Sequence, residues 1–236
     1  PPPLDLAALH AGRLSRLRAT MADHGLDLCV LTNPVNLRYA ANYRSFPLFQ
    51  SHIPSTYLMV PVEGPLVLYG GYCGPLDTVD ENRPAHSVTS FDAGLGLSAV
   101  AAGFADDVAG FLGEVGLPAD AVVGLERTTP SGHAALSNAD LHIVDSDPVL
   151  ELARSRKSSL EIEALRYSID VAELGLAEME AALVPGVSEN QLWSILHQVN
   201  IAHDGDWIDG RMLCSGPRSN PWYQEATGRA IQVGDL

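Results

Sequence analysis

The chain has 236 residues, of which 46% are apolar and 18% charged, and its 29 acidic and 14 basic side chains give a formal net charge of −15. It is too apolar for a disordered chain, and its acid excess would repel phosphate backbones and anionic headgroups, which argues against nucleic acid and membrane surfaces as partners. Three widely spaced cysteines without a CxxC motif, and a start without the basic and apolar regions of a signal peptide, predict a cytoplasmic protein with free thiols.

A layered α/β domain is predicted over residues 1–154, because short apolar strands alternate with helical patterns. The helices are indicated by apolar residues at a spacing of three or four, and the strands by short apolar runs closed by turn residues. In chain order we expect a helix over residues 5–24, strands over residues 26–31, 57–62 and 66–69, a helix over residues 97–115, and strands over residues 122–125 and 141–144.

A second domain is predicted over residues 155–236, where the composition changes and a helical pattern covers residues 159–183. Pro185 and Gly186 end this helix, and Ser188 with Gln191 begins another that runs toward residue 204. Residues 211–216 and 230–236 have the composition of strands, and the second strand stops at the last residue. We therefore expect the chain to be the front part of a longer protein.

The sequence contains no complete catalytic motif: it lacks a GxSxG elbow, an HExxH motif, a glycine-rich phosphate loop and a His or Cys pair at metal-ligand spacing. Two clusters remain. Residues 33–39 and 46–54 are rich in proline and aromatic side chains and are expected on a loop, either as a packed crossover or as a binding site. Residues 215–225 gather an arginine with Trp and Tyr side chains, which indicates either a pocket wall or a subunit contact.

The order and spacing of several short segments resemble a known superfamily. Asn-Pro-Val-Asn-Leu-Arg-Tyr at residues 33–39 resembles the creatinase/prolidase N-terminal domain. Four further segments resemble the opening of the pita-bread metalloenzyme domain: Lys157 with residues 161–166, residues 185–189, Ser215-Gly216 and Gly234-Asp235. Residues 188–193, 205–208 and 215–225 look most like the dimethylsulfoniopropionate lyases of that superfamily. Ordinary Xaa-Pro aminopeptidases carry a histidine after the proline where this chain has Trp222-Tyr223, which counts against peptidase chemistry.

This resemblance implies a creatinase-like N-terminal α/β domain followed by an incomplete pita-bread α+β domain. It also implies a dinuclear divalent centre, most simply of iron or manganese, whose ligands would all lie beyond Leu236. In the family the N-terminal domain of one subunit of a homodimer covers the catalytic domain of its partner. The implied substrate-binding residues are Phe49 and His52 on the covering side and Trp207, Arg218, Trp222 and Tyr223 on the catalytic side.

Three hypotheses about function follow. The first is a metal-dependent lyase that cleaves dimethylsulfoniopropionate, or a related small zwitterion, to dimethyl sulfide and acrylate, with aromatic faces on the sulfonium group. The second is an Xaa-Pro aminopeptidase or prolidase-type metallohydrolase. The third comes from another class of protein, a non-catalytic dimerisation or binding module.

Overall fold

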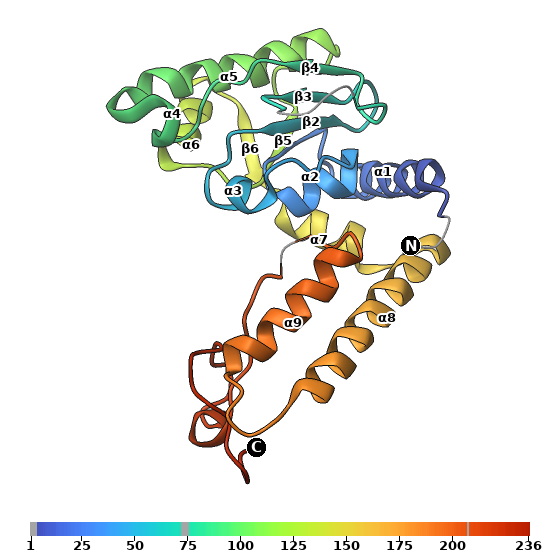
Figure 1. Cartoon of the computed structure of the whole chain (residues 1–236). Coiled ribbons are helices and arrows are strands. Elements are labelled where there is room, and N and C mark those ends of the chain that lie inside the picture. Colours follow the sequence, from blue (N-terminus) through green and yellow to red (C-terminus); the bar gives the residue numbers. More distant parts are fainter. Residues whose placement is uncertain (1–3, 72–75, 207) are drawn as a thin grey trace. The chain divides into compact units, whose positions relative to one another are not determined.

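The computed structural model describes residues 4–71, 76–206 and 208–236. The chain divides into two compact units, and each is considered by itself: one comprises Asp5–Ser158, and the other contains Ser159–Leu236 (Figure 1). The predicted domain border at residue 154 falls inside the last helix of the first unit. The exact extent of the two domains therefore stays a proposal.

The first unit is built on a mixed six-stranded sheet with the strand order β4-β3-β2-β1-β5-β6. Strand β1 pairs antiparallel with β2 and parallel with β5, while β2–β3 is antiparallel and β3–β4 and β5–β6 are parallel. The strands are β1 (Leu28–Leu31), β2 (Tyr57–Pro61), β3 (Val67–Tyr69), β4 (Glu81–Arg83), β5 (Val122–Leu125) and β6 (His142–Asp145). The α/β prediction and the five predicted strands are thus confirmed, whereas β4 was not predicted.

Helices cover both faces of this sheet, so its central strands are buried on both sides. Leu28 and Val30 of β1 belong to one apolar cluster and Cys29 and Leu31 to the other, as the alternation of side chains along a strand requires. Helices α1 (Leu6–Asp23), α2 (Pro34–Ala41) and α7 (Asp147–Ser155) contribute to the cluster that contains Cys29. Helices α5 (Leu97–Glu114) and α6 (Pro130–Asn138) contribute to the other.

The proline- and aromatic-rich cluster at residues 33–39 and 46–54 is not the loop that we expected from the sequence. It forms α2 and a second short helix, α3 (Pro47–His52), each with a proline in its first turn. Asn33 caps α2 by accepting a hydrogen bond from the N–H of Val35 at 2.9 Å. Proline is typical both of turns and of the first turn of a helix, so proline content alone did not indicate these two helices.

Ser90–Glu114, within the described residues, is long and apolar enough to cross a membrane by length and composition. This stretch comprises the short helices α4 (Ser90–Ala93) and η1 (Gly94–Gly96) and the whole of α5. In α5, Phe104, Val108 and Phe111 are fully buried against the sheet. These contacts are typical of the core helix of a globular domain.

The second unit begins with two helices, α8 (Ser159–Ala182) and α9 (Glu189–Ala202), as predicted. A capping box at Ser188 and Gln191 starts α9. The predicted strands at residues 211–216 and 230–236 are wrong, because these segments form only isolated bridges, Met212 with Glu225 and Ser188 with Ala230. A short 3₁₀ helix, η2 (Gly216–Ser219), lies between them.

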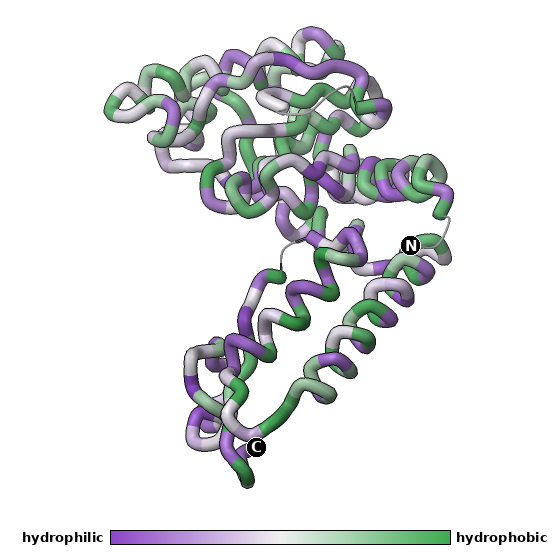
Figure 2. The backbone as a smooth tube through the Cα atoms, viewed as in Figure 1, coloured by the Kyte–Doolittle hydropathy of each residue, from purple (hydrophilic) through white to green (hydrophobic). Residues whose placement is uncertain are grey.

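One side of α8 is apolar yet exposed. Hydrophobic segments recur along this helix in Figure 2. The side chains of Ile162, Leu165, Ile169 and Leu176 are 39–57% exposed. Only Glu161 and Gly175 of α8 are buried. The second unit therefore rests on a much smaller apolar core than the first.

Candidate functional site

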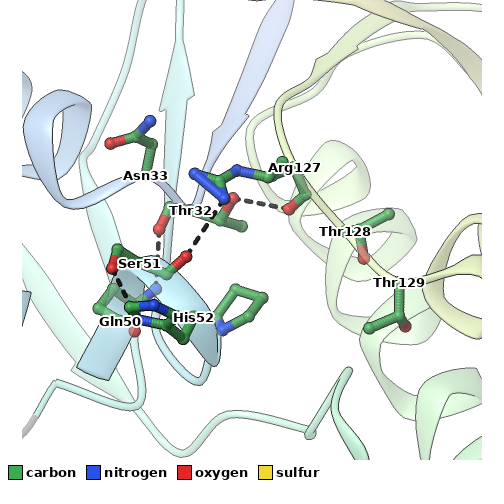
Figure 3. Close-up of a pocket in the computed structure, with 9 residues that line it drawn as sticks. Thr32, Asn33, Gln50, Ser51, His52, Arg127, Thr128 and Thr129 are labelled. Carbon is green, nitrogen blue, oxygen red and sulfur yellow. Dashed lines mark hydrogen bonds between the residues drawn. The ribbon is translucent and has the colours of Figure 1, made fainter. Parts of the chain in front are cut away.

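The first unit has a small pocket where two parallel strands end. Strands β1 and β5 are neighbours, so the connections after Leu31 and Leu125 leave the sheet side by side. In open α/β sheets, ligands bind in the crevice at the carboxyl ends of the strands. The pocket has a volume of about 140 Å³ and is lined by Thr32, Asn33, Gln50, Ser51, His52, Pro54, Arg127, Thr128 and Thr129 (Figure 3).

Glu126, the first residue after β5, holds one wall of this pocket in place. Its carboxylate accepts hydrogen bonds from the N–H groups of Thr32 and Asn33, at 2.7 and 2.6 Å, and from the side chain of Asn36. Partial burial raises the pKa of Glu126 above its usual range, and the three donors only partly offset this effect. Glu126 thus links the end of β5 to the start of α2 through hydrogen bonds.

Gln50 of α3 holds the opposite wall. Its side-chain N–H groups donate to the carbonyls of Thr32 and Thr56, at 2.8 and 2.6 Å, and its amide oxygen accepts from the N–H of Thr56 at 3.1 Å. Gln50 is only 4% exposed, so these bonds satisfy a polar group that burial would otherwise penalise. The amide therefore ties α3 to the ends of β1 and β2.

Arg127 spans the pocket between the two walls (Figure 3). Its guanidinium donates to the carbonyl of Ser51 at 3.2 Å, and its own carbonyl accepts from the hydroxyl of Thr32 at 2.7 Å. Residues 127–129 also line a second, more open hollow of about 530 Å³, which includes Asp145 and Asp147 at the end of β6. Arg127 is thus an exposed cation between two hollows at one edge of the sheet.

The predicted residues Phe49 and His52 both lie on α3. His52 lines the pocket, and its Nδ1 lies 2.8 Å from the carbonyl of Leu48. Phe49 meets Phe91 edge to face, with 5.2 Å between the ring centroids. The structure thus brings these two residues to one short helix beside the pocket, and their role in binding stays a prediction.

In the second unit the polar centre is Glu189, at the start of α9. This side chain is fully buried and accepts hydrogen bonds from the N–H and hydroxyl groups of Ser215 and Thr227, at 2.8–3.0 Å, and from the Arg218 guanidinium. Although burial alone would raise the pKa of Glu189, the hydrogen bonds from Thr227, Ser215 and Arg218 outweigh it and lower the pKa to about 2. The Arg218 guanidinium is therefore already engaged in an ion pair with the buried Glu189 carboxylate.

Trp222 and Tyr223 extend from the same segment and are 76% and 69% exposed. Their rings meet edge to face with centroids 5.1 Å apart. Trp207 lies outside the described residues. Trp222 and Tyr223 thus present accessible aromatic faces, while Arg218 of the same segment already has an acidic partner. The binding role predicted for these residues is not tested by this arrangement.

The described residues contain no group of three or more His, Cys, Asp or Glu side chains that could hold a metal ion. The expectation that the family's metal ligands lie beyond Leu236 stays a prediction, and the metal itself is not tested. The residues present do not fit a dinuclear centre.

The sequence did not single out Gln50, Glu126, Arg127 or Glu189. A signal was available for two of them: Glu-Arg-Thr-Thr-Pro directly follows a strand, and polar residues at a strand's carboxyl end are typical of α/β sites. Glu189 offered no such signal, because an acidic residue in the first turn of a helix is ordinary. Its partners, Ser215 and Thr227, are 26 and 38 residues away.

Comparisons with known proteins extend these observations. Residues 13–156 match the Creatinase/Prolidase N-terminal domain. The chain is 31% identical over 242 residues to the dimethylsulfoniopropionate lyase DddP of Roseobacter denitrificans and 30% identical to that of Roseovarius nubinhibens, covering 98% of this chain and 54% of each relative. The chain therefore spans about half the length of these curated relatives.

Solved structures share the fold at lower identity. The Xaa-Pro dipeptidase from Bacillus anthracis has a TM-score of 0.70 and 20% identity, covering 96% of this chain and 59% of that one. The X-Pro aminopeptidase from Thermotoga maritima has a TM-score of 0.67 and 18% identity, covering 94% of this chain and 58% of that one. These likenesses extend across both units.

Proposed function

The chain belongs to the pita-bread family that carries the creatinase/prolidase N-terminal domain, and from this premise we propose that its protein is a metal-dependent lyase of dimethylsulfoniopropionate. One observation carries the proposal. The chain is 30–31% identical to two such lyases over 98% of its length, whereas its identity to structurally similar peptidases is 15–22%. The pair Trp222-Tyr223 supports it, because ordinary Xaa-Pro aminopeptidases resemble this segment but carry a histidine there.

The proposed reaction is an elimination. A base removes the proton next to the substrate carboxylate, the electron pair forms the carbon–carbon double bond of acrylate, and the C–S bond breaks so that dimethyl sulfide leaves with its electrons. The proposed dinuclear iron or manganese centre would polarise the carboxylate. The described part of this chain has no residues that fit such a centre, so the roles assigned to it are those of substrate binding.

Within the proposal, this chain supplies aromatic surface for the sulfonium cation. Trp222 and Tyr223 have accessible faces, and Phe49 and His52 would complete the cavity from the partner subunit of a homodimer. A cation over an aromatic ring gains about 0.5 to 2 kcal/mol per good contact. Arg218 would act indirectly, because its ion pair with Glu189 holds the segment that carries the two aromatic residues.

The experiment uses the full-length protein supplied with iron or manganese and measures dimethyl sulfide and acrylate released from dimethylsulfoniopropionate. Equal amounts of both products, together with a Trp222→Ala variant that raises KM more than it lowers kcat, are expected. Absence of release from a preparation that holds stoichiometric metal would overturn the proposal.

The second candidate is an Xaa-Pro peptidase, which is favoured by the TM-scores of 0.62–0.70 with prolidases and Xaa-Pro peptidases. Cleavage of an Xaa-Pro dipeptide by the same preparation, without dimethyl sulfide release, would select it. A dimer that binds less than stoichiometric metal and cleaves neither substrate would instead select the non-catalytic module.

A further inference from the structure

We infer that the pocket at the ends of β1 and β5 is a binding site for a small carboxylate monoanion, with Arg127 as its cation. The inference concerns this chain alone and does not rest on the lyase reaction. Arg127 contacts the pocket through its side chain, and the neighbouring residues 128 and 129 line it as well (Figure 3). The pocket volume of about 140 Å³ suits a ligand of a few heavy atoms.

Arg127 has hydrogen-bonding capacity to spare. Its one protein acceptor among the described residues is the carbonyl of Ser51 at 3.2 Å, and it faces no carboxylate at ion-pair distance. Arg83, Arg154, Arg211, Arg218 and Arg229, in contrast, are each engaged in an ion pair. In a chain with a net charge of −15, an arginine that meets only a carbonyl is a cation available to a ligand.

The main chain beside Arg127 offers further donors. Within the described part of the chain, the N–H groups of Thr128 and Thr129 have no hydrogen-bond acceptor. The pocket wall is rigid on the other side, because Gln50 and Glu126 fix Thr32 and Asn33 through their main-chain groups. A planar guanidinium matches the two oxygens of a carboxylate, and the free N–H groups belong to two residues that line the same pocket.

The surroundings select the charge of the ligand. Asp145 and Asp147 line the neighbouring hollow, which shares residues 127–129 with this pocket, and the Glu126 carboxylate directly precedes Arg127. These acidic groups would repel a dianion such as hydrogen phosphate more strongly than a monoanion. We therefore expect acetate or acrylate to bind in preference to inorganic phosphate.

The test is an NMR titration of the ¹⁵N-labelled 236-residue chain with acrylate, acetate, phosphate and neutral acrylamide. Acrylate has nearly the shape of acrylamide, so this pair isolates the effect of the charge. We expect saturable shifts confined to residues 32–33, 50–53 and 127–129, with a dissociation constant on the order of a millimolar. Arg127→Ala should weaken binding about tenfold or more, and Arg127→Lys by less.

Arg166→Ala on α8 is the matched control, because it removes the same charge from the other unit and should leave binding unchanged. Near-UV circular dichroism checks that each variant is folded. Equal shifts with acrylamide, equal binding by Arg127→Ala, tighter binding of phosphate, or no saturable shift would each overturn the inference. Carboxylate binding without lyase activity in the full-length protein would leave the inference standing and remove only the proposed reaction.

Discussion

Glu126 and Glu189 carry opposite pKa shifts, although both bind main-chain N–H groups. For Glu126 burial is the largest cause and raises the pKa, and Asp147 adds a like charge. For Glu189 burial acts in the same direction, but the hydroxyl and N–H donors and the Arg218 guanidinium outweigh it. A full set of donors that includes a cation therefore lowers the pKa of Glu189, whereas the donors around Glu126 do not outweigh its burial.

Replacing Glu189 by Gln should destabilise the second unit. The amide keeps the volume but removes the charge opposite Arg218 and presents N–H groups to the hydroxyl and N–H donors of Ser215 and Thr227. Breaking such a buried pair costs about 3 to 5 kcal/mol. Urea unfolding followed by tryptophan fluorescence measures this loss of stability.

Glu225→Gln, which breaks the exposed pair with Arg211, is the control and should cost less than about 1 kcal/mol. Equal losses would refute the assignment.

The contribution of Glu189 should also depend on pH. Its pKa is about 2 in the folded chain and near 4.5 in the unfolded chain, so the stabilisation is complete above pH 4.5 and declines as the pH falls toward 2. The difference in unfolding free energy between the wild type and Glu189→Gln should accordingly shrink over this range. Chemical unfolding at pH 7, 4.5 and 3 tests this, and a difference that grows on acidification would contradict it.

Two of the three glycines in helix α5 allow the effect of packing to be separated from that of helix propensity. A Cβ at Gly103 would overlap the imidazole of His86, whose Nδ1 lies 2.8 Å from Asp107 of the same helix. The Asp107 carboxylate also accepts a hydrogen bond from the hydroxyl of the fully buried Tyr57. The absence of a side chain at position 103 therefore permits the connection after β4 to lie against α5.

Gly103→Ala should destabilise the first unit by about 1 to 3 kcal/mol, because the imidazole must move away from Asp107. Gly110→Ala is the matched control: no atom lies within 4 Å of the new Cβ, and the change should stabilise the helix by about 0.5 to 1 kcal/mol. Thermal unfolding of the two variants should shift in opposite directions. Two shifts of the same sign would show that crowding at His86 does not decide the outcome.

Elements that bury an apolar face could be predicted from sequence, and those held by distant polar contacts could not. Strands β1 and β2 are short apolar runs that are buried on both faces of the sheet. Helix α5 repeats its apolar residues at helical spacing along the face that packs against the sheet. Strand β4 is three polar residues at an edge of the sheet, and nothing in its composition indicates pairing with β3. The segment at residues 211–216 has the apolar composition of a strand but pairs only through Met212, so local propensity misled.

The same division applies to the candidate site. Phe49 and His52 were found through a family resemblance, and the structure places both on α3. Arg127 and Glu126 matter because β1 and β5 are parallel neighbours, and their residues come together from positions more than 90 apart in the chain. That pairing is a property of the sheet topology, which cannot be inferred from a single sequence. The site could therefore be predicted only in part.

Over the whole molecule, apolar burial is distributed unevenly between the two units. Both large apolar clusters belong to the first unit. The buried apolar residues of the second are Leu192, Trp193, Val199 and Ala226 among those described. Since apolar burial supplies most of the driving force for folding, the second unit should open more readily than the first.

Amide hydrogen exchange of the 236-residue chain should reveal this difference. Helix α5 has 18 residues and α8 has 24, but α5 buries Phe104, Val108 and Phe111, whereas α8 buries none of its leucine or isoleucine side chains. We expect the central amides of α8 to exchange on the order of 100-fold faster than those of α5, and those of α9, which buries Trp193, at an intermediate rate. Mass spectrometry of peptides from the three helices measures these rates. Equal protection of α5 and α8 would mean that polar contacts such as those of Glu189, rather than apolar burial, determine the stability of the second unit.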